Sequence, residues 1–323
     1  MTPHGDLELH GRLHADLGHH RWAAAVVTPS GTRLTTRDVD LEADLEIGSV
    51  SKGITGLLYA DAIDRHEVSP SDTLGQHLPL PHCPAAGVTL AALSTHSSGL
   101  PSLPSPGLGL GRTAKWLVTQ ANPYGDTLDE LLAQVARTRL GTPGRSLYSN
   151  IGFQLLGHAT AAAAGMPYRD LVGRRLALPL GLTSLNVPAR RAELSSSSVI
   201  GRSRLGRVAQ PWTGEAVGPA GGIRMSITDL ARLLQALLDG TSPGLTALDP
   251  VADFIGKDTR IGAGWITSPG STGPVTWHNG ATGGFRTWVG LDRAAGSAVA
   301  IVNARVKAPD VVGSRLLASL ALG

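Results

Sequence analysis

A serine and a lysine lie three positions apart in the segment Ser49-Val50-Ser51-Lys52. Positions i and i+3 share one face of a helix, so the Ser49 hydroxyl and the Lys52 amine can meet one turn apart. The following residues are nearly all apolar, which predicts a buried helix, and burial lowers the pKa of a lysine towards that of a useful base. The pair predicts a serine nucleophile with a lysine base. The alternative for an isolated Ser-x-x-Lys is a lysine on a solvated helix surface.

The second candidate motif is Tyr148-Ser149-Asn150, at the entry to an expected helix over 151–164. A phenol close to an amine can share the role of base or protonate a leaving group. The Asn150 amide can hold a substrate carbonyl and orient the lysine. The alternative is a helix-start turn in which Tyr148 covers the edge of the core.

The third candidate motif is His278-Asn279-Gly280, on an expected strand. A glycine two positions after the histidine leaves a bare backbone against which an acyl group can lie. The N–H groups of Ala281 and Ser49 can then act as two donors to an oxyanion. The alternative is a half-buried strand histidine before a glycine-rich hairpin. Arg286, shortly after the motif, is either an anion-binding residue or a surface residue of the next strand.

The elements that must position these motifs follow from hydrophobic periodicity. The pattern predicts strands over 22–28, 32–36, 261–266, 274–279, 286–291 and 297–303, and helices over 49–65, 89–94, 127–138, 151–164, 168–176, 227–238 and 309–321. Strands near both ends of the chain, joined by short turns, favour one antiparallel sheet with helices on its faces. We therefore expect an α+β fold with an inserted all-helical lobe. The predicted domains are a discontinuous α/β domain (1–72 and 206–323) and a helical domain (73–205).

Composition excludes several classes of protein. Of the 323 residues, 42% are hydrophobic and 16% charged, which excludes a disordered chain. No apolar run approaches the roughly 20 residues that cross a membrane, and the N-terminus lacks the apolar segment of a signal peptide, so we expect a cytoplasmic protein. The single cysteine, Cys83, and the histidine spacing disfavour a metal site. The basic residues form no block, which makes nucleic acid an unexpected partner.

The ordered set of Ser-x-x-Lys, Tyr-x-Asn and His-x-Gly resembles the serine β-lactamase and penicillin-binding-protein superfamily. It is most similar to the branch with class C β-lactamases, D-alanyl-D-alanine carboxypeptidases, D-aminopeptidases and β-lactamase-like esterases. The segments 45–51 (LEIGSVS), 90–101 (LAALSTHSSGLP) and 218–230 (GPAGGIRMSITDL) extend the resemblance over most of the chain. It implies the sheet-and-helical-lobe fold described above.

The resemblance also implies residue roles and a ping-pong cycle. Catalysis would involve Ser49 as the acylated nucleophile, Lys52 as its base, and Tyr148 as the partner of the lysine. Substrate binding would involve Asn150, His278, Gly280 and Ala281, with Arg286 as a further candidate. The resemblance implies a small-molecule acyl substrate, no metal or organic cofactor, and no obligate protein partner.

One departure from the family pattern bears on the substrate. The third motif of true β-lactamases usually begins with lysine, whereas this chain has His278, which is mostly neutral at pH 7. We therefore expect little β-lactamase activity. The lack of a signal peptide favours an intracellular ester, amide or small peptide as the substrate. Three functions stay open: a hydrolase, an acyltransferase whose loop 101–125 helps to form an acceptor pocket, and a non-catalytic binding relative. Four aromatic residues are either pocket walls or core: Trp116, Tyr124, Trp212 and Trp277.

Overall fold

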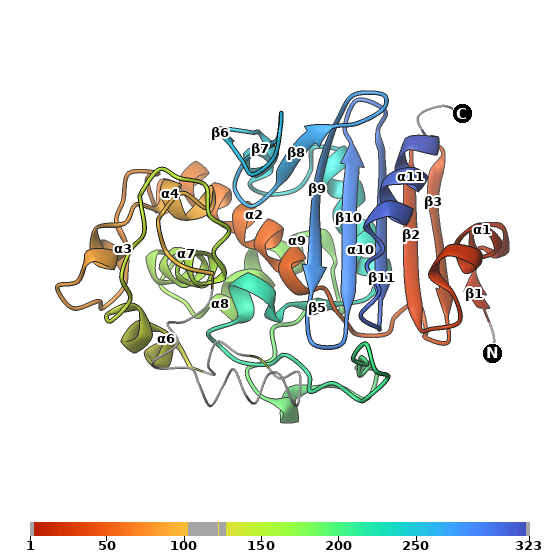
Figure 1. Cartoon of the computed structure of the whole chain (residues 1–323), viewed down its shortest axis with the longest axis horizontal. Helices are drawn as coiled ribbons and strands as arrows, with labels where there is room; N and C mark the ends of the chain where they lie inside the picture. Colours follow the sequence, from red (N-terminus) through yellow and green to blue (C-terminus); the bar gives the residue numbers. More distant parts are fainter. Residues whose placement is uncertain (1–2, 103–121, 123–126, 321–323) are drawn as a thin grey trace.

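A nine-stranded antiparallel sheet forms one side of the molecule in the computed structural model, which describes residues 3–102, 122 and 127–320. The strand order is β1-β3-β2-β11-β10-β9-β8-β7-β6 (Figure 1), so the three N-terminal strands join the C-terminal strands at the β2–β11 pair. The strands are β1 (Pro3–Gly5), β2 (Trp22–Thr28), β3 (Gly31–Arg37), β6 (Ala252–Asp253), β7 (Arg260–Ile261), β8 (Ile266–Pro269), β9 (Pro274–Ala281), β10 (Arg286–Asp292) and β11 (Ser297–Asn303). A separate pair joins β4 (Leu45–Glu46) to β5 (Arg224–Met225).

Helices cover both faces of the sheet. Side chains alternate between the two faces along each strand, so each strand contributes to the packing on both sides. One face packs against α1 (Leu7–Leu17) and α11 (Asp310–Leu320) through a cluster that includes Trp22 and Trp288. The other face packs against α2 (Ser51–Asp64) and α10 (Ile227–Leu238). Ser226 caps α10, since its side chain accepts a hydrogen bond from the N–H of Asp229.

Most of the remaining helices gather beside the sheet, at the left of Figure 1. They are α3 (Leu74–His77), α4 (Leu90–Ser94), α6 (Leu128–Val135), α7 (Asn150–Ala163) and α8 (Tyr168–Val172). Helix α9 (Leu178–Leu180) lies nearer the strands and contacts α10. The antiparallel sheet and its flanking helices confirm the predicted α+β fold. None of the helices in the described part of the chain has the length and apolar character of a transmembrane span.

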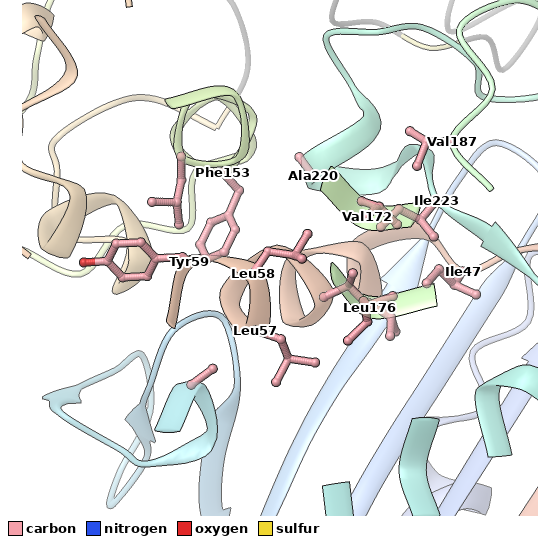
Figure 2. Close-up of a cluster of buried hydrophobic side chains, with 14 of the residues drawn as sticks. Ile47, Leu57, Leu58, Tyr59, Phe153, Val172, Leu176, Val187, Ala220 and Ile223 are labelled. Carbon is pink, nitrogen blue, oxygen red and sulfur yellow. The ribbon is translucent and has the colours of Figure 1, made fainter. Parts of the chain in front are cut away.

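Helix α2 runs through the centre of the main hydrophobic core. Twelve of its 14 residues are buried, and Figure 2 shows apolar side chains on several sides of this helix, with Phe153 of α7 beside Leu58. Glycines allow the close approach of neighbouring elements: a Cβ on Gly56 would lie 1.8 Å from the Ala263 carbonyl oxygen. This burial fixes the position of the residues at the start of α2.

The expected single strand over 261–266 is wrong. The chain forms two short strands, β7 and β8, separated by a turn in which Gly264 has φ +77°. The side chain of Trp265 leaves the strand pattern to donate a hydrogen bond of 3.1 Å to the Gly53 carbonyl on α2. An apolar run that looks like one strand is here a tight turn held against the core helix.

A buried histidine on α7 makes the stability of the fold depend on pH. His158 is 4% exposed, and burial lowers its pKa to about 4. In the unfolded chain this group titrates near its ordinary value of about 6.5, so the unfolded state binds the extra proton first as pH falls. The contribution of His158 to the free energy of unfolding is therefore complete above about pH 6.5 and is lost as pH falls towards about 4.

The free energy of unfolding is therefore expected to fall by about 2 kcal/mol between about pH 7.5 and about pH 5 through His158 alone. Urea titrations across this range would measure the loss, and His158→Gln should remove that share of it. The exposed His82→Gln is the matched control, with the wild-type pH dependence expected. Equal pH dependence in the wild type and His158→Gln would show that His158 does not titrate in this way.

Candidate active site

Residues from all three sequence motifs meet at one cavity of about 450 Å³ beside the end of β9. Its lining residues are Ser49, Tyr148, Asn150, Trp212, Asn279, Gly280, Ala281, Ala308, Arg286 and Asp310. Most of them come from the turn before α2, the residues at the start of α7, the end of β9, the start of β10 and the start of α11, whereas Trp212 and Ala308 lie in loops. The cavity therefore lies where the sheet meets the helices beside it.

Ser49, which lines this cavity, faces the buried Lys52. Ser49 lies in a short 3₁₀ turn, Gly48–Val50, that leads directly into α2. Lys52 Nζ is 3.1 Å from Ser49 Oγ, within hydrogen-bond reach. The i, i+3 spacing of the motif thus forms the contact that the sequence predicts.

The environment of Lys52 favours a neutral amine. Its side chain is fully buried, and burial lowers the pKa of the ammonium well below its usual range. Nζ also donates a 2.6 Å hydrogen bond to the carbonyl of Ala220, in the turn Gly218–Gly222. One turn further along α2, Thr55 donates to the carbonyl of Pro219, which holds the same turn in place. A neutral lysine held in this way can accept the proton of Ser49.

Tyr148 forms the side of this site next to Lys52. Lys52 Nζ lies 4.9 Å from the centre of the Tyr148 ring. Behind Tyr148, the ring of His96 lies 4.5 Å away between centroids, and His96 Nδ1 accepts a 3.0 Å hydrogen bond from the N–H of Ser149. Ser149 in turn caps α7 through a 2.9 Å bond from the N–H of Gly152. His96 thus supports Tyr148 as well as the start of α7.

His278 is placed behind the cavity wall. It is 1% exposed, does not line the cavity, and its ring centroid is 6.3 Å from that of Tyr148. Its Nδ1 lies 2.6 Å from the Asn279 carbonyl, which can only accept, so Nδ1 carries the proton. Burial, and then the nearby Lys52, lower the pKa of His278 to about 3. It is a neutral neighbour of the serine–lysine site rather than a cation at the cavity surface.

Two backbone N–H groups are placed to bind an oxyanion. Thr282 N–H donates to the Phe285 carbonyl, so in the alternating antiparallel ladder the next pair, Ala281–Arg286, is a non-hydrogen-bonded pair. The N–H of Ala281 therefore points away from β10. The N–H of Ser49 is at the start of its turn, where it has no intrahelical partner.

The two glycines beside these donors permit their close approach. Gly48 has φ +55°, and a Cβ there would lie 2.6 Å from the nitrogen of Ala281. A Cβ on Gly280 would lie 2.1 Å from the Ile47 carbonyl oxygen and 3.2 Å from the nitrogen of Ser49. Only bare backbone can bring β9 and the nucleophile turn this close.

Asn150 and Arg286 both line the cavity. The amide of Asn150 donates a 3.2 Å hydrogen bond to Ser102 Oγ. Arg286 directs Nη1 to the carbonyls of Thr282 and Phe285, each at 2.8 Å. Burial lowers the pKa of Arg286 from its usual value, and the Asp310 carboxylate opposes that effect. The structure brings both predicted binding residues to the cavity.

Sequence reasoning missed Asn279, Ala308 and Asp310 as lining residues. Asp310 is the first residue of α11, about thirty positions after the third motif, and no local pattern marks it. Trp212, a candidate pocket wall, does line the cavity. Its backbone N–H donates a hydrogen bond to the carboxylate of the buried Glu46, which also forms an ion pair with Arg224. Trp277 lies away from the cavity and donates to Ser268.

The other expectations for pocket walls fall outside the structure's described part. Trp116, Tyr124 and most of the loop 101–125 lie outside the described residues. Among the residues that are described, no group of three or more His, Cys, Asp or Glu side chains could hold a metal ion.

Curated proteins with sequences similar to this chain are named as a carboxypeptidase/endopeptidase and as beta-lactamases. The chain is 25% identical over 275 residues to "D-alanyl-D-alanine-carboxypeptidase/endopeptidase AmpH" of Escherichia coli, covering 78% of this chain and 68% of that protein. It is 26% identical over 298 residues to a beta-lactamase of Pseudomonas fluorescens, covering 80% of this chain and 78% of that protein.

Solved structures share the fold. A beta-lactamase/D-alanine carboxypeptidase from Pseudomonas syringae superposes with a TM-score of 0.79 at 17% identity, covering 98% of this chain and 97% of that one. A class C beta-lactamase from Rhodobacter sphaeroides gives a TM-score of 0.77 at 20% identity, with the same two coverages. The family model described as Beta-lactamase matches residues 15–322, and with the geometry above this places the chain in the beta-lactamase family.

Proposed function

We propose that this protein is a serine hydrolase that forms an acyl-enzyme on Ser49 and cleaves an ester, an amide or a small-peptide bond. The observation that carries the proposal is the contact of 3.1 Å between Ser49 Oγ and Lys52 Nζ, with Lys52 fully buried. A lysine that makes no use of its amine would not be expected at a position where its charge is so costly.

The first half-reaction forms an ester to Ser49. Ser49 Oγ attacks the acyl carbonyl, and the neutral Lys52 amine takes the hydroxyl proton. The N–H groups of Ser49 and Ala281 stabilise the oxyanion of the tetrahedral intermediate. When the intermediate collapses, the bond to the leaving group breaks, and the proton passes from Lys52, with Tyr148 beside it, to that group.

The second half-reaction returns the free enzyme. Water attacks the acyl carbonyl and gives a proton to the Lys52–Tyr148 pair, and the proton then returns to Ser49 as the carboxylic acid leaves. The proposed substrate class includes peptides because a relative of this chain carries the name of a carboxypeptidase/endopeptidase. A neutral, buried His278 favours weak rather than strong β-lactam turnover.

The proposal is tested by intact-mass measurement after mixing the protein with a p-nitrophenyl ester, nitrocefin or a D-Ala-D-Ala peptide. We expect the wild type to gain the mass of one acyl group from at least one donor, and Ser49→Ala to gain none. An adduct that survives in Ser49→Ala, or the absence of both adduct and Ser49-dependent turnover with every donor, would count against an acyl-enzyme at Ser49.

The acyltransferase alternative shares the first half-reaction and differs only in what attacks the ester. Adding an amine or an alcohol to the same assay separates the two. Hydrolysis predicts free acid at a rate independent of the acceptor. Product that forms only in the presence of the acceptor would replace the hydrolase proposal with acyl transfer.

A further inference from the structure

The side of the cavity next to α11 carries a negative charge. Asp310 lines the cavity, and its Oδ1 accepts a 2.6 Å hydrogen bond from the side-chain amide of Asn279. Asn279 is neutral, so this bond orients the carboxylate without cancelling its charge. The positive end of a helix would attract an anionic substrate group, but here the first residue of α11 places its own carboxylate there.

One cation shares the cavity with this carboxylate. Arg286 lines the cavity and interacts electrostatically with Asp310, although within the described part of the chain the two side chains form no ion pair at contact distance. Arg286 Nη1 is turned towards backbone carbonyls of its own segment. Lys52 and His278, the other basic groups nearby, are buried in environments that favour their neutral forms. The Asp310 side therefore suits a cationic group.

The separation along β9 limits which substrate atom can reach Asp310. The acyl carbonyl would lie at the N–H of Ala281, and Asn279 is two residues back along the strand. Two residues of an extended strand span about 7 Å, which a saturated chain covers in about five or six bonds. On this spacing, an amino group directly beside the scissile carbonyl falls short of the carboxylate that Asn279 holds.

We propose, on the basis of the acyl-enzyme function above, that the cavity takes acyl donors with an ammonium group about five or six bonds from the scissile carbonyl, and that Asp310 binds this ammonium. The carboxylate would accept charge-assisted hydrogen bonds from the ammonium, with Asn279 holding it in orientation. Asp310 is then a specificity-determining residue, and the preferred substrate is an ω-aminoacyl compound.

The test compares two p-nitrophenyl esters of equal length, the 6-aminohexanoate and the heptanoate. The quantity measured is the ratio of kcat/KM for the ammonium ester to that for the neutral ester. Asp310→Asn should lower this ratio about tenfold, as expected for the loss of a charge-assisted contact, and Asp310→Glu should keep most of it. Asp253→Asn, at a side chain that is 99% exposed, is the control with the wild-type ratio.

A short pair of esters tests the spacing. The ratio of glycinate to propanoate should change less than about twofold in Asp310→Asn, because the ammonium of glycine lies next to the carbonyl. An equal change in the short and the long pair would overturn the assigned spacing. An unchanged ratio for the long pair, with a Ser49 adduct still formed, would overturn the role of Asp310 while leaving the acyl-enzyme proposal intact.

Binding can be measured without any turnover. Hexylammonium and hexanol are compared by ligand-observed NMR with the wild type and with Asp310→Asn. We expect tighter binding of hexylammonium than of hexanol to the wild type, and loss of that preference in the variant. Equal preference in both proteins would overturn the inference even if no ester acylates Ser49.

Discussion

Replacing Lys52 with arginine is expected to lower the rate of Ser49 acylation by at least about 10²–10⁴-fold, the usual effect of removing a general base. A guanidinium keeps its proton at any pH at which the protein is folded, so it cannot accept one from Ser49. It would also place a permanent charge at a fully buried position next to the Ala220 carbonyl. Stopped-flow release of p-nitrophenol, together with intact mass, measures the loss.

Lys52→Met separates the chemical effect from the cost of a buried charge. Methionine fills a similar space without a charge, so this variant should fold, as circular dichroism would show, and should lose acylation to the same degree. The exposed Lys257→Arg is the matched control, with unchanged rates expected. Normal acylation by a folded Lys52→Met would show that another group is the base.

Replacing Gly280 with alanine is expected to lower kcat about 10²–10³-fold, as for the loss of one oxyanion donor. The new Cβ would lie 2.1 Å from the Ile47 carbonyl oxygen, so β9 and the nucleophile turn must move apart. That movement separates the N–H of Ala281 from the N–H of Ser49. Steady-state kinetics with a p-nitrophenyl ester would show the effect mainly in kcat.

Gly273→Ala controls for the general cost of a glycine substitution. Gly273 lies just before β9, and apart from its chain neighbours no described residue has an atom within 4 Å of a Cβ built there. This variant should match the wild type in kcat. Wild-type kcat in Gly280→Ala would contradict the placement of the oxyanion site at the end of β9.

The sequence predicts the catalytic elements well because their signals are local. A serine and a lysine at i and i+3 before an apolar helix can meet only in a few ways, and the structure has that contact. The helix over 227–238 is predicted at the bounds that α10 has, because an N-cap and strong periodicity agree. The domain boundaries, the residue roles and the cytoplasmic location stay predictions.

The rest could not be predicted because it depends on contacts between distant segments. Asp310 reaches the cavity only through the packing of α11 on the sheet, and His278 is buried by elements that the sequence does not show around it. The turn between β7 and β8 is set by Trp265 binding to the Gly53 carbonyl, more than 200 positions earlier. Periodicity reports which residues are apolar, but it does not show where their partners lie.

The order of strands in the sheet has a consequence for synthesis on the ribosome. β2 pairs with β3 on one side and with β11 on the other, so residues 22–28 must wait for residues 297–303 before both edges of β2 are paired. A nascent chain thus carries an apolar strand edge, of the kind that joins other chains, for most of its translation. Yield in cells should accordingly depend on translation speed and on chaperones that cover such edges.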